Sequence, residues 1–473
     1  MTDQAKETAD DPIELIQNDP IELQNDPIKL QNDSTKSIAE VFSDCTVLVT
    51  GGLGLLGTLL IEKLLRFCPK VKTLYVLVRK KDGKSLDERV KQLAEMPLYK
   101  KLNKEQPNFL KKLTLIEGNL DTENLGLSPE DRDKLLDTEV IFHGTVIIRS
   151  NLCTMANIHV KSTEQILLLA KNMSNLKAFV HLSTVFAHWK HKSIKEKHYT
   201  PPRGYNIVSE LNGSWLNTFA YTKAIAEETV LRYCDKIPAC IVRPSVVTST
   251  WKEPIMGWVD SVYGPVGLLV GSDLGLLRTI DCDTNKKLDL VPADYVTSCL
   301  IAAAWCTMKN AEELKKKDSK PDIEKVPVYN FVSSCQEPIT WRKFQEYVRA
   351  HRSTKLLSMF WNNTLWMQHK ILGYLSYLLP AVVANRAVVL AGQNASRCMT
   401  YNLMNSYLES MHHFMTQQLN IENKATVKLW EQMSAEDRKI FEFDMRNFDW
   451  NEYVKQMIKG IHEIANETSN DVV

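Results

Sequence analysis

Three glycines are the residues of this chain whose spacing most directly suggests chemistry. Gly51, Gly54 and Gly57 form a G-x-x-G-x-x-G pattern between a β-like run and a helical pattern, with Leu55 and Leu56 inside the turn. Residues without Cβ let backbone N–H groups approach a pyrophosphate, and the N-terminus of the following helix offers it further donors. The pattern predicts a dinucleotide site, although a glycine-rich turn without a ligand is the alternative.

Polar side chains follow the other β-like runs. Residues 79–81, which begin with Arg79, stand where an acidic residue would bind a ribose 2′-hydroxyl. Cations there suit a 2′-phosphate and favour NADP over NAD, the alternative being a solvated basic loop. Asn119 follows the third run, where its amide could reach adenine. Ser183 and Thr184 follow the fifth run, and Lys223 lies one helix later.

The elements that must position these residues alternate between strand and helix. The β-like runs are 46–50, 73–78, 113–117, 139–143, 177–182 and 239–243, and helical patterns between them include 54–66, 154–172 and 215–234. Apolar strands joined by helices predict a doubly wound parallel α/β sheet of the Rossmann type. Ligands of such sheets bind at the carboxyl ends of the strands.

Composition limits the function classes. The chain has 473 residues, a formal net charge of +1, 44% hydrophobic and 24% charged residues. This balance is typical of a globular protein and gives no reason to expect nucleic acid as a partner. The ten cysteines have no metal-ligand spacing, and His188, His191 and His198 are interpreted as part of a solvated loop. We therefore predict no metal site. The N-terminus lacks the apolar core of a signal peptide, which indicates a cytosol-facing protein.

We predict five regions along the chain. They are a disordered repeat tail (1–38), an NADP-binding reductase domain with substrate-binding elements (39–310), a connector (311–355), an apolar segment (356–395) and a C-terminal helical module (396–473). Within the apolar segment, residues 371–384 carry no charge. As a helix they would span about 21 Å, less than the roughly 30 Å hydrocarbon core. An interfacial helix or a membrane hairpin is therefore favoured, with an internal helix as the alternative.

The sequence resembles the extended short-chain dehydrogenase/reductase group and, within it, the fatty acyl-CoA reductases. Besides the glycine pattern, the resemblance rests on LKAFVHLST at 176–184, IVRPSVVTSTWKEPI at 241–255, GWVD at 257–260, GPVG at 264–267 and LVPAD at 290–294. It covers about residues 40 to 462 and extends to the C-terminal helical module.

This resemblance implies an activity and a location. It implies reduction of a long-chain acyl-CoA to a fatty alcohol by NADPH, in two hydride transfers through an aldehyde. It also implies a membrane-associated enzyme of the endoplasmic reticulum or peroxisome with a cytosolic catalytic domain. Association of copies of the chain into a homo-oligomer stays open.

The resemblance further implies catalytic roles, and here the chain departs from the family. Such enzymes use a Tyr-x-x-x-Lys pair, in which Tyr handles the proton at the carbonyl oxygen and Lys binds the nicotinamide ribose, together with a Ser/Thr for the substrate oxygen. Lys223 and Ser183 or Thr184 match these positions, but the Tyr position is Phe219 and the position of a family Asn is His159.

Two hypotheses follow from these departures. Phe219 has no exchangeable proton, so reduction would be impaired, because general acid catalysis typically contributes about 10²–10⁴-fold. The alternative is a catalytically inactive, membrane-associated protein that binds a nucleotide or acyl-CoA. His159 could replace the missing acid, although a buried histidine bonded to the backbone is the commoner arrangement.

Overall fold

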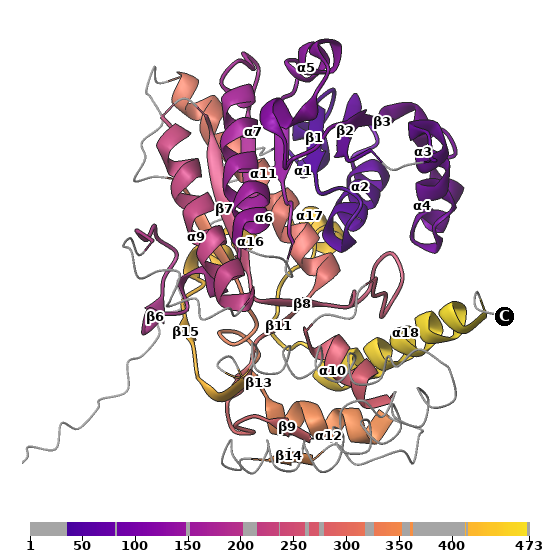
Figure 1. Ribbon diagram of the computed structural model, residues 1–473, viewed down its shortest axis with the longest axis vertical. Helices are drawn as coiled ribbons and strands as arrows, with labels where there is room; N and C mark the ends of the chain where they lie inside the picture. The colour runs from indigo at the N-terminus through magenta and orange to yellow at the C-terminus, as the bar shows by residue number, and fades with distance from the viewer. Residues whose placement is uncertain are drawn as a thin grey trace, which may run out of the picture. The chain divides into compact units, whose positions relative to one another are not determined.

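A parallel sheet with helices on both faces organises the chain (Figure 1). The computed structural model describes residues 36–80, 83–147, 152–201, 215–235, 237–260, 264–273, 279–316, 326–351, 360–362, 412 and 415–470. Seven strands pair in the order β12-β7-β5-β4-β1-β2-β3, all parallel. They are β1 (Thr46–Thr50), β2 (Thr73–Val78), β3 (Leu113–Glu117), β4 (Val140–His143), β5 (Ala178–Leu182), β7 (Ala239–Pro244) and β12 (Val328–Phe331).

The predicted fold class and the six predicted strands are confirmed, and β12 is an edge strand that the sequence reading missed. It has only four residues, with Asn330 among them, so it carries little of the apolar signal of a buried strand. β1 and β4 are neighbours in the sheet, and the strand order runs outward from them in opposite directions. β2 and β3 lie on the side of β1, whereas β5, β7 and β12 lie on the side of β4. Such a switch point is where open α/β sheets bind ligands.

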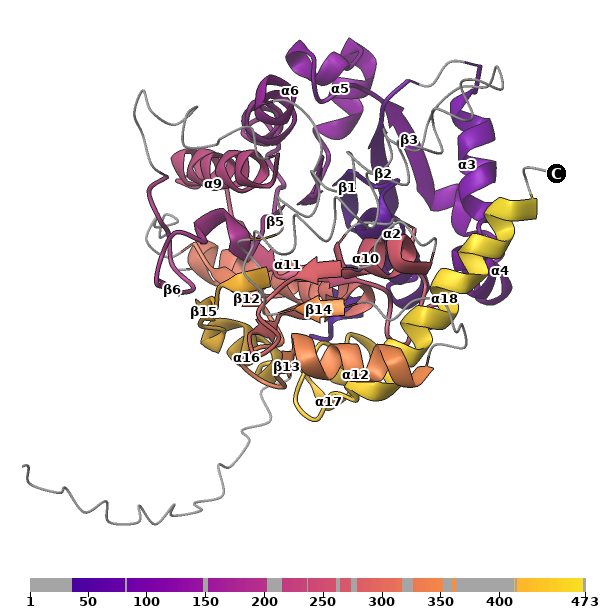
Figure 2. The same ribbon diagram turned by 60° about the horizontal axis from the view of Figure 1, so that its bottom comes forward.

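The side chains of successive residues in a strand point to opposite faces of the sheet, so each face has its own hydrophobic core. Val47 and Val49 belong to the cluster that includes α2 (Leu55–Phe67) and α11 (Ala293–Lys316). Leu48 belongs to the cluster with α5 (Pro129–Leu135), α7 (Ser162–Ala170) and α9 (Trp215–Tyr233). Figure 2 shows α5 and α9 on one side of the strands and α11 on the other.

The other elements are short or lie outside this sheet. The helices are α1 (Ile38–Val41), α3 (Leu86–Glu95), α4 (Lys100–Glu105), α6 (Leu152–Ala156), α10 (Gly264–Asp273) and α12 (Trp341–His351). The 3₁₀-helices are η1 (Pro97–Tyr99), η2 (Phe109–Lys112), η3 (Glu123–Gly126) and η5 (Val185–His188), and η4 (Asn157–Lys161) is a π-helix. Two-stranded sheets form from β8 (Val246–Thr248) with β11 (Leu290–Pro292), β9 (Thr279–Asp281) with β14 (Phe360–Asn362), β10 (Lys287–Leu288) with β13 (Ile339–Thr340), and β6 (Ser193–Ile194) with β15 (Asn420–Ile421).

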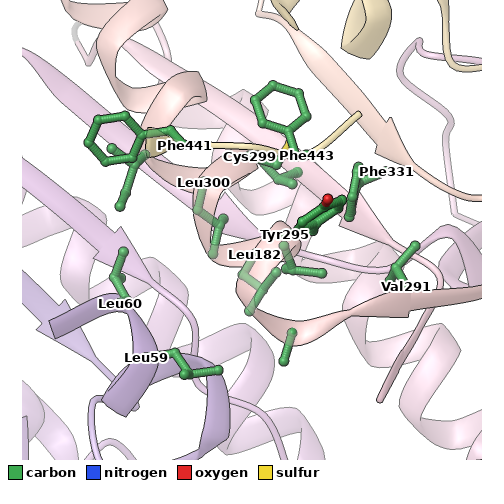
Figure 3. Packing of buried hydrophobic residues seen from close by; sticks show 14 of the residues in the cluster. Leu59, Leu60, Leu182, Val291, Tyr295, Cys299, Leu300, Phe331, Phe441 and Phe443 are labelled. Atoms are coloured by element: carbon green, nitrogen blue, oxygen red, sulfur yellow. The ribbon is translucent and has the colours of Figure 1, made fainter. Parts of the chain in front are cut away.

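The C-terminal module consists of α16 (Lys424–Glu431), α17 (Ala435–Ile440) and α18 (Trp450–Asn470). It packs on the Rossmann sheet through α11, where Phe441 and Phe443 lie beside Leu300 and Cys299 (Figure 3). α18 runs beside α12 and α10 (Figure 1). The helical character predicted for this module is confirmed in the described residues.

A hydrogen bond from α1 to the capped start of α17 joins the first described helix to the C-terminal module. The Ser434 hydroxyl accepts the Asp437 N–H, as the predicted Ser-x-x-Asp cap requires. The Asp437 carboxylate accepts the N–H of Ile38 at 3.2 Å, and Ile38 is fully buried. Residues 36–38, which we assigned to the tail, therefore belong to the fold.

A loop from the most family-specific segment packs directly on α18. Gly257 has φ of +72°, and a Cβ on Gly460 would clash with the Gly257 carbonyl oxygen, so the two backbones touch. The Asp294 carboxylate accepts the N–H groups of Trp251 and Lys252 at 2.8 and 2.9 Å. These contacts fix the loop between α11 and the C-terminal module.

Two stretches of the predicted regions lie wholly outside the described residues. They are the apolar run 371–384 and residues 1–35 of the predicted tail. Among the residues that are described, no helix is long and apolar enough to cross a membrane. The other predicted region boundaries stay predictions.

Candidate active site

A cavity of about 680 Å³ opens where the strands of the sheet end. Its walls come from the residues that follow β1, β2, β3, β4, β5 and β7. It brings together most of the residues predicted for the site, namely Gly51, Gly54, Leu55, Leu56, Gly57, Arg79, Asn119, Ser183, Thr184 and Phe219. Lys223 and His159 are not among the described residues that line it.

The glycine turn has room for a ligand at one position in particular. A Cβ on Gly57 would clash with the Gly51 carbonyl oxygen, so the turn itself requires glycine there. A Cβ on Gly54 would meet only the Gly51 oxygen at 3.6 Å, an ordinary contact, and the φ of Gly54 is −90°. The fold therefore accepts a side chain at 54, and glycine at that position keeps the cavity wall open for a ligand.

The helix that starts at this turn has no side-chain cap. Ser37, Ser85, Ser128 and Ser434 each accept a first-turn N–H of their helices with a hydroxyl, whereas α2 starts at Gly54 without such a bond. The first-turn N–H groups of α2 are thus available to an anion, at the positive end of the helix dipole. This arrangement fits a pyrophosphate.

Two guanidinium groups line the cavity near the end of β2. Arg79 is exposed, and Arg89 of α3 donates from Nη1 to the Arg79 carbonyl oxygen at 2.6 Å. Arg89 was missed in the sequence. The cue was the capping box of Ser85 and Glu88, which starts a helix soon after β2 and directs its first turn to the site.

Asn119 lies in the turn after β3. Its side-chain oxygen accepts the N–H of Asp121 at 3.1 Å, and its backbone N–H donates to Leu125 O at 2.6 Å. These bonds hold the side chain at the cavity wall, where the predicted contact with adenine would be made.

The two hydroxyls after β5 have different surroundings. Thr184 Oγ1 donates to Pro244 O and accepts the Phe186 N–H, both at 3.3 Å. Ser183 is one of the residues that line the cavity, but it is only 4% exposed. Its Oγ is buried, and no described residue forms a hydrogen bond with it. A buried hydroxyl without a partner costs about 1–3 kcal/mol, so a ligand oxygen at this place would relieve that cost.

Phe219 places an apolar ring at the cavity wall. It lies in the first half of α9, lines the cavity and is 8% exposed. Behind it, the ring of His159 meets the Phe219 ring edge-on, with centroids 5.6 Å apart. The structure therefore has an aromatic ring at this point of the cavity wall, and the match of Phe219 to the family's Tyr position stays a prediction.

His159 is held with both ring nitrogens bonded. Nε2 accepts the N–H of Ile147 at 3.1 Å, so Nδ1 carries the proton and donates to Thr222 Oγ1 at 2.8 Å. Burial, with Lys223 and His143 nearby, lowers the pKa of His159 to about 2. It is a neutral residue bonded to the backbone, the commoner arrangement that the sequence analysis described, and it does not reach the cavity.

His143 is enclosed in the same way. Its Nδ1 lies 2.8 Å from Thr50 Oγ1, and its Nε2 lies 2.8 Å from Thr163 Oγ1. Thr163 donates to the His159 carbonyl, so His143 donates from Nε2 and accepts from Thr50 at Nδ1. Burial lowers its pKa to about 3. The neighbouring His181 has no bond to either ring nitrogen among the described residues.

Lys223 is buried and is not among the described residues that line the cavity. Its Nζ donates to the Leu182 carbonyl oxygen at 2.6 Å, and the residue is 2% exposed. Burial lowers its pKa to about 8, against the opposing influence of Glu227. Its contact with a nicotinamide ribose stays a prediction.

Of the three loop histidines, His191 is exposed, as a solvated loop requires, and His198 is half-buried, whereas His188 is buried and differs from our interpretation. His188 is 4% exposed, and its Nε2 lies 2.7 Å from the carboxylate of Glu227. Arg243 donates to the same carboxylate from Nε and Nη2 at 2.8 and 2.6 Å. Glu227 comes from α9 and Arg243 from β7, so this buried cluster ties the loop after β5 to the fold. The partners are distant in sequence, which is why the loop alone suggested solvent.

Another part of the cavity is apolar. Its described lining includes Phe186, Val246, Val247, Val259 and Val266. Apolar walls beside a few convergent polar groups are typical of a small-molecule site. An aliphatic chain could bind along them.

Comparisons with known proteins agree with this geometry. Two sequence families described as male sterility protein match the chain, one for NAD binding at residues 49–300 and one at residues 376–466. The chain is 34% identical to fatty acyl-CoA reductase 1 of Rattus norvegicus over 451 residues, 90% of this chain and 85% of the relative. It is 29% identical to fatty acyl-CoA reductase wat of Drosophila melanogaster over 457 residues, 91% and 86% of the two chains.

Solved structures show the same fold. The terminal R domain of the myxalamid biosynthetic pathway superposes with a TM-score of 0.63 at 18% identity, covering 89% of this chain and 91% of that one. The reductase domain of a nonribosomal peptide synthetase of Mycobacterium tuberculosis gives 0.59 at 13% identity, with 90% and 95% covered.

These matches include the glycine turn, all the strand ends around the cavity and most of the C-terminal module. The range 49–300, which matches the family for NAD binding, contains every described residue that lines the cavity. At this identity and coverage the chain belongs to the fatty acyl-CoA reductase family.

Proposed function

We propose that this protein uses NADPH to reduce the thioester carbonyl of a long-chain acyl-CoA. The observation that carries the proposal is the buried Ser183 hydroxyl, which has no described partner and belongs to a residue of the cavity wall, together with the glycine turn in the same wall. A thioester oxygen is an acceptor of the kind that this hydroxyl lacks.

The chain's own residues supply binding and orientation. The turn at Gly54 and the uncapped start of α2 would hold the pyrophosphate, and Arg79 with Arg89 would hold the 2′-phosphate. The bound cofactor would supply the hydride. Ser183 would donate a hydrogen bond to the carbonyl oxygen as negative charge develops there. The apolar lining would bind the acyl chain.

The test is NADPH oxidation by the purified protein across acyl-CoA lengths, with products identified directly. Ser183→Ala should lower kcat at least tenfold, or about 1.4 kcal/mol, with NADPH affinity unchanged. Ser162→Ala is the matched control, because Ser162 is buried outside the cavity and donates to Ile158 O. Equal loss in both variants would contradict the role of Ser183.

A second candidate is favoured by one observation, the apolar ring of Phe219 at the cavity wall. A binding protein without catalysis would bind NADPH and acyl-CoA and would oxidise no NADPH. The same assay, combined with binding measurements, distinguishes this candidate from the enzyme.

We also propose that the protein attaches to a membrane through residues 371–384 and faces the cytosol, at the endoplasmic reticulum or peroxisome. The support is the uncharged run in the sequence and membership of the family.

A further inference from the structure

The cavity contains hydrogen-bond donors but no described group suited to give up a proton at neutral pH. Its described lining includes no Tyr, His, Lys or Cys. The titratable side chains among the lining residues are Arg79, Arg89, Asp121 and Asp260. Guanidinium groups do not release a proton in proteins, and ionised carboxylates only accept.

The nearest basic groups are enclosed behind the cavity wall. The hydrogen bonds of His159 to Ile147 and Thr222 use both ring nitrogens. Those of His143 to Thr50 and Thr163 do the same. The proton-bearing Nζ of Lys223 is directed to the Leu182 carbonyl. None of these groups is among the described residues that line the cavity, so a bound substrate oxygen would meet Ser183 and Thr184 but no acid among those residues.

The two hydride transfers to an acyl thioester differ in their need for an acid. The first hydride adds to the carbonyl carbon and gives an oxyanion. When the C=O bond re-forms, the C–S bond breaks and the thiolate leaves. Thiols have a pKa near 8.5, so the thiolate leaves without a proton and takes one from water afterwards. The carbonyl oxygen is never protonated in this step, and a hydrogen bond from Ser183 is enough to stabilise its charge.

The second hydride transfer, to the aldehyde, ends differently. It gives an alkoxide that has no group to expel. An alkoxide is about as basic as hydroxide, so it takes a proton from water at neutral pH. It must therefore receive a proton as the hydride arrives, and a positioned acid typically contributes about 10²–10⁴-fold to such a step.

We infer that this protein is an aldehyde-forming reductase, because the described lining of its cavity can support the first hydride transfer and includes no acid for the second. The inference rests on the proposed function. Acyl-CoA, NADPH and one proton give fatty aldehyde, free CoA thiol and NADP⁺. The proton ends on the thiol sulfur, and the two electrons of the hydride reduce the acyl carbon. A separate aldehyde-consuming reaction must follow in the cell.

The experiment measures stoichiometry with the full-length protein, palmitoyl-CoA and NADPH. NADPH consumption is compared with CoA thiol release, aldehyde is trapped with a hydrazine reagent, and alcohol is measured by mass spectrometry. We expect one NADPH per thiol and aldehyde as the main product. Two NADPH per thiol with alcohol as the product would overturn the inference and leave the proposed function intact. No thiol release at any acyl length would overturn both.

The variant Phe219→Tyr tests whether the second hydride transfer fails for want of an acid at this place in the cavity wall. It adds one oxygen at i−4 to Lys223, and we expect aldehyde reduction to rise at least tenfold while thiol release changes less than threefold. The ratio of NADPH to thiol should then approach two. Phe186→Tyr is the matched control, because it adds the same phenol elsewhere on the cavity wall and should leave the ratio near one. An unchanged ratio in Phe219→Tyr, or an equal gain in both steps, would overturn the inference.

Discussion

The ammonium of Lys223 donates a hydrogen bond to the carbonyl oxygen of Leu182 at 2.6 Å, inside the wall of the cavity. Both residues belong to elements that frame the site, α9 and β5. In this position the lysine supports the strand end and does not contact the described cavity.

This burial predicts a pH dependence of stability. The pKa of Lys223 is about 8 in the fold, lowered by burial from its ordinary 10.5. At a pH between these two pKa values, the lysine is protonated in the unfolded chain and neutral in the folded chain. The contribution of Lys223 to the free energy of unfolding therefore rises with pH. Relative to Lys223→Met, the native free energy of unfolding should increase from pH 8 to 10, by at most about 1.4 kcal/mol per unit. Urea unfolding of both proteins measures this, and parallel pH profiles would contradict it.

Arg79 and Arg89 should together determine cofactor preference. Arg79→Ala should remove much of the preference for NADPH over NADH, with little change for NADH, because the 2′-phosphate is the group that a guanidinium binds. Arg89→Ala should act in the same direction, since Arg89 bonds the Arg79 carbonyl. Lys91→Ala, on the same helix but outside the described cavity lining, is the control. Isothermal titration gives the affinities, and equal native affinities for the two nucleotides would refute the assignment.

Two glycine substitutions should have opposite consequences. Gly54→Ala should fold with a Tm close to the native one and lose at least tenfold in NADPH affinity, because the methyl group would project to the pyrophosphate position. Gly57→Ala should lower the Tm strongly, since its Cβ would clash with the Gly51 carbonyl. Thermal unfolding and NADPH titration separate the two effects. Native affinity in Gly54→Ala would show that the turn binds no pyrophosphate.

The buried histidines predict acid sensitivity. Burial lowers the pKa of His143, His159 and His181 below the ordinary 6.5. Below pH 6.5 the unfolded chain binds protons that the fold excludes, so stability falls as the pH decreases, by up to about 1.4 kcal/mol per unit for each histidine.

A matched pair of variants checks this. His181→Leu loses no described hydrogen bond and should be less acid-sensitive, with native or higher stability at pH 7.5. His143→Leu loses its bonds to Thr50 and Thr163 and should cost about 1–3 kcal/mol there. Equal destabilisation of the two at pH 7.5, by urea unfolding, would contradict the hydrogen-bond assignment.

The apolar run at 371–384 predicts membrane attachment. The expressed full-length protein should sediment with membranes and require detergent for release. Replacing two apolar residues of the run with lysine, for example Leu375→Lys and Leu378→Lys, should shift it to the supernatant, because charged side chains do not enter the bilayer readily. Native protein that stays soluble without detergent would refute the attachment.

The sequence predicted what depends on local pattern. The glycine turn, six strands and the capping serine of α17 follow from short-range rules of spacing and propensity, and the structure confirms them. The sequence could not predict the direction of side chains, because the orientation of Lys223, for example, depends on how α9 packs on β5. The burial of His188 depends on Glu227, 39 residues away along the chain. Arg89 was missed because its place at the site depends on where α3 begins.

The contact between Gly257 and Gly460 bears on how relatives of this protein diverge. The segment around residues 241–257 is the most recognisable of the chain, and its described contacts fasten a loop to α11 and α18 through Asp294 and this glycine pair. Selection for architecture alone would preserve such a segment. A duplicated gene could therefore keep this segment unchanged while its catalytic residues change and the enzyme makes a different product. The segment alone would then not reveal that the product has changed.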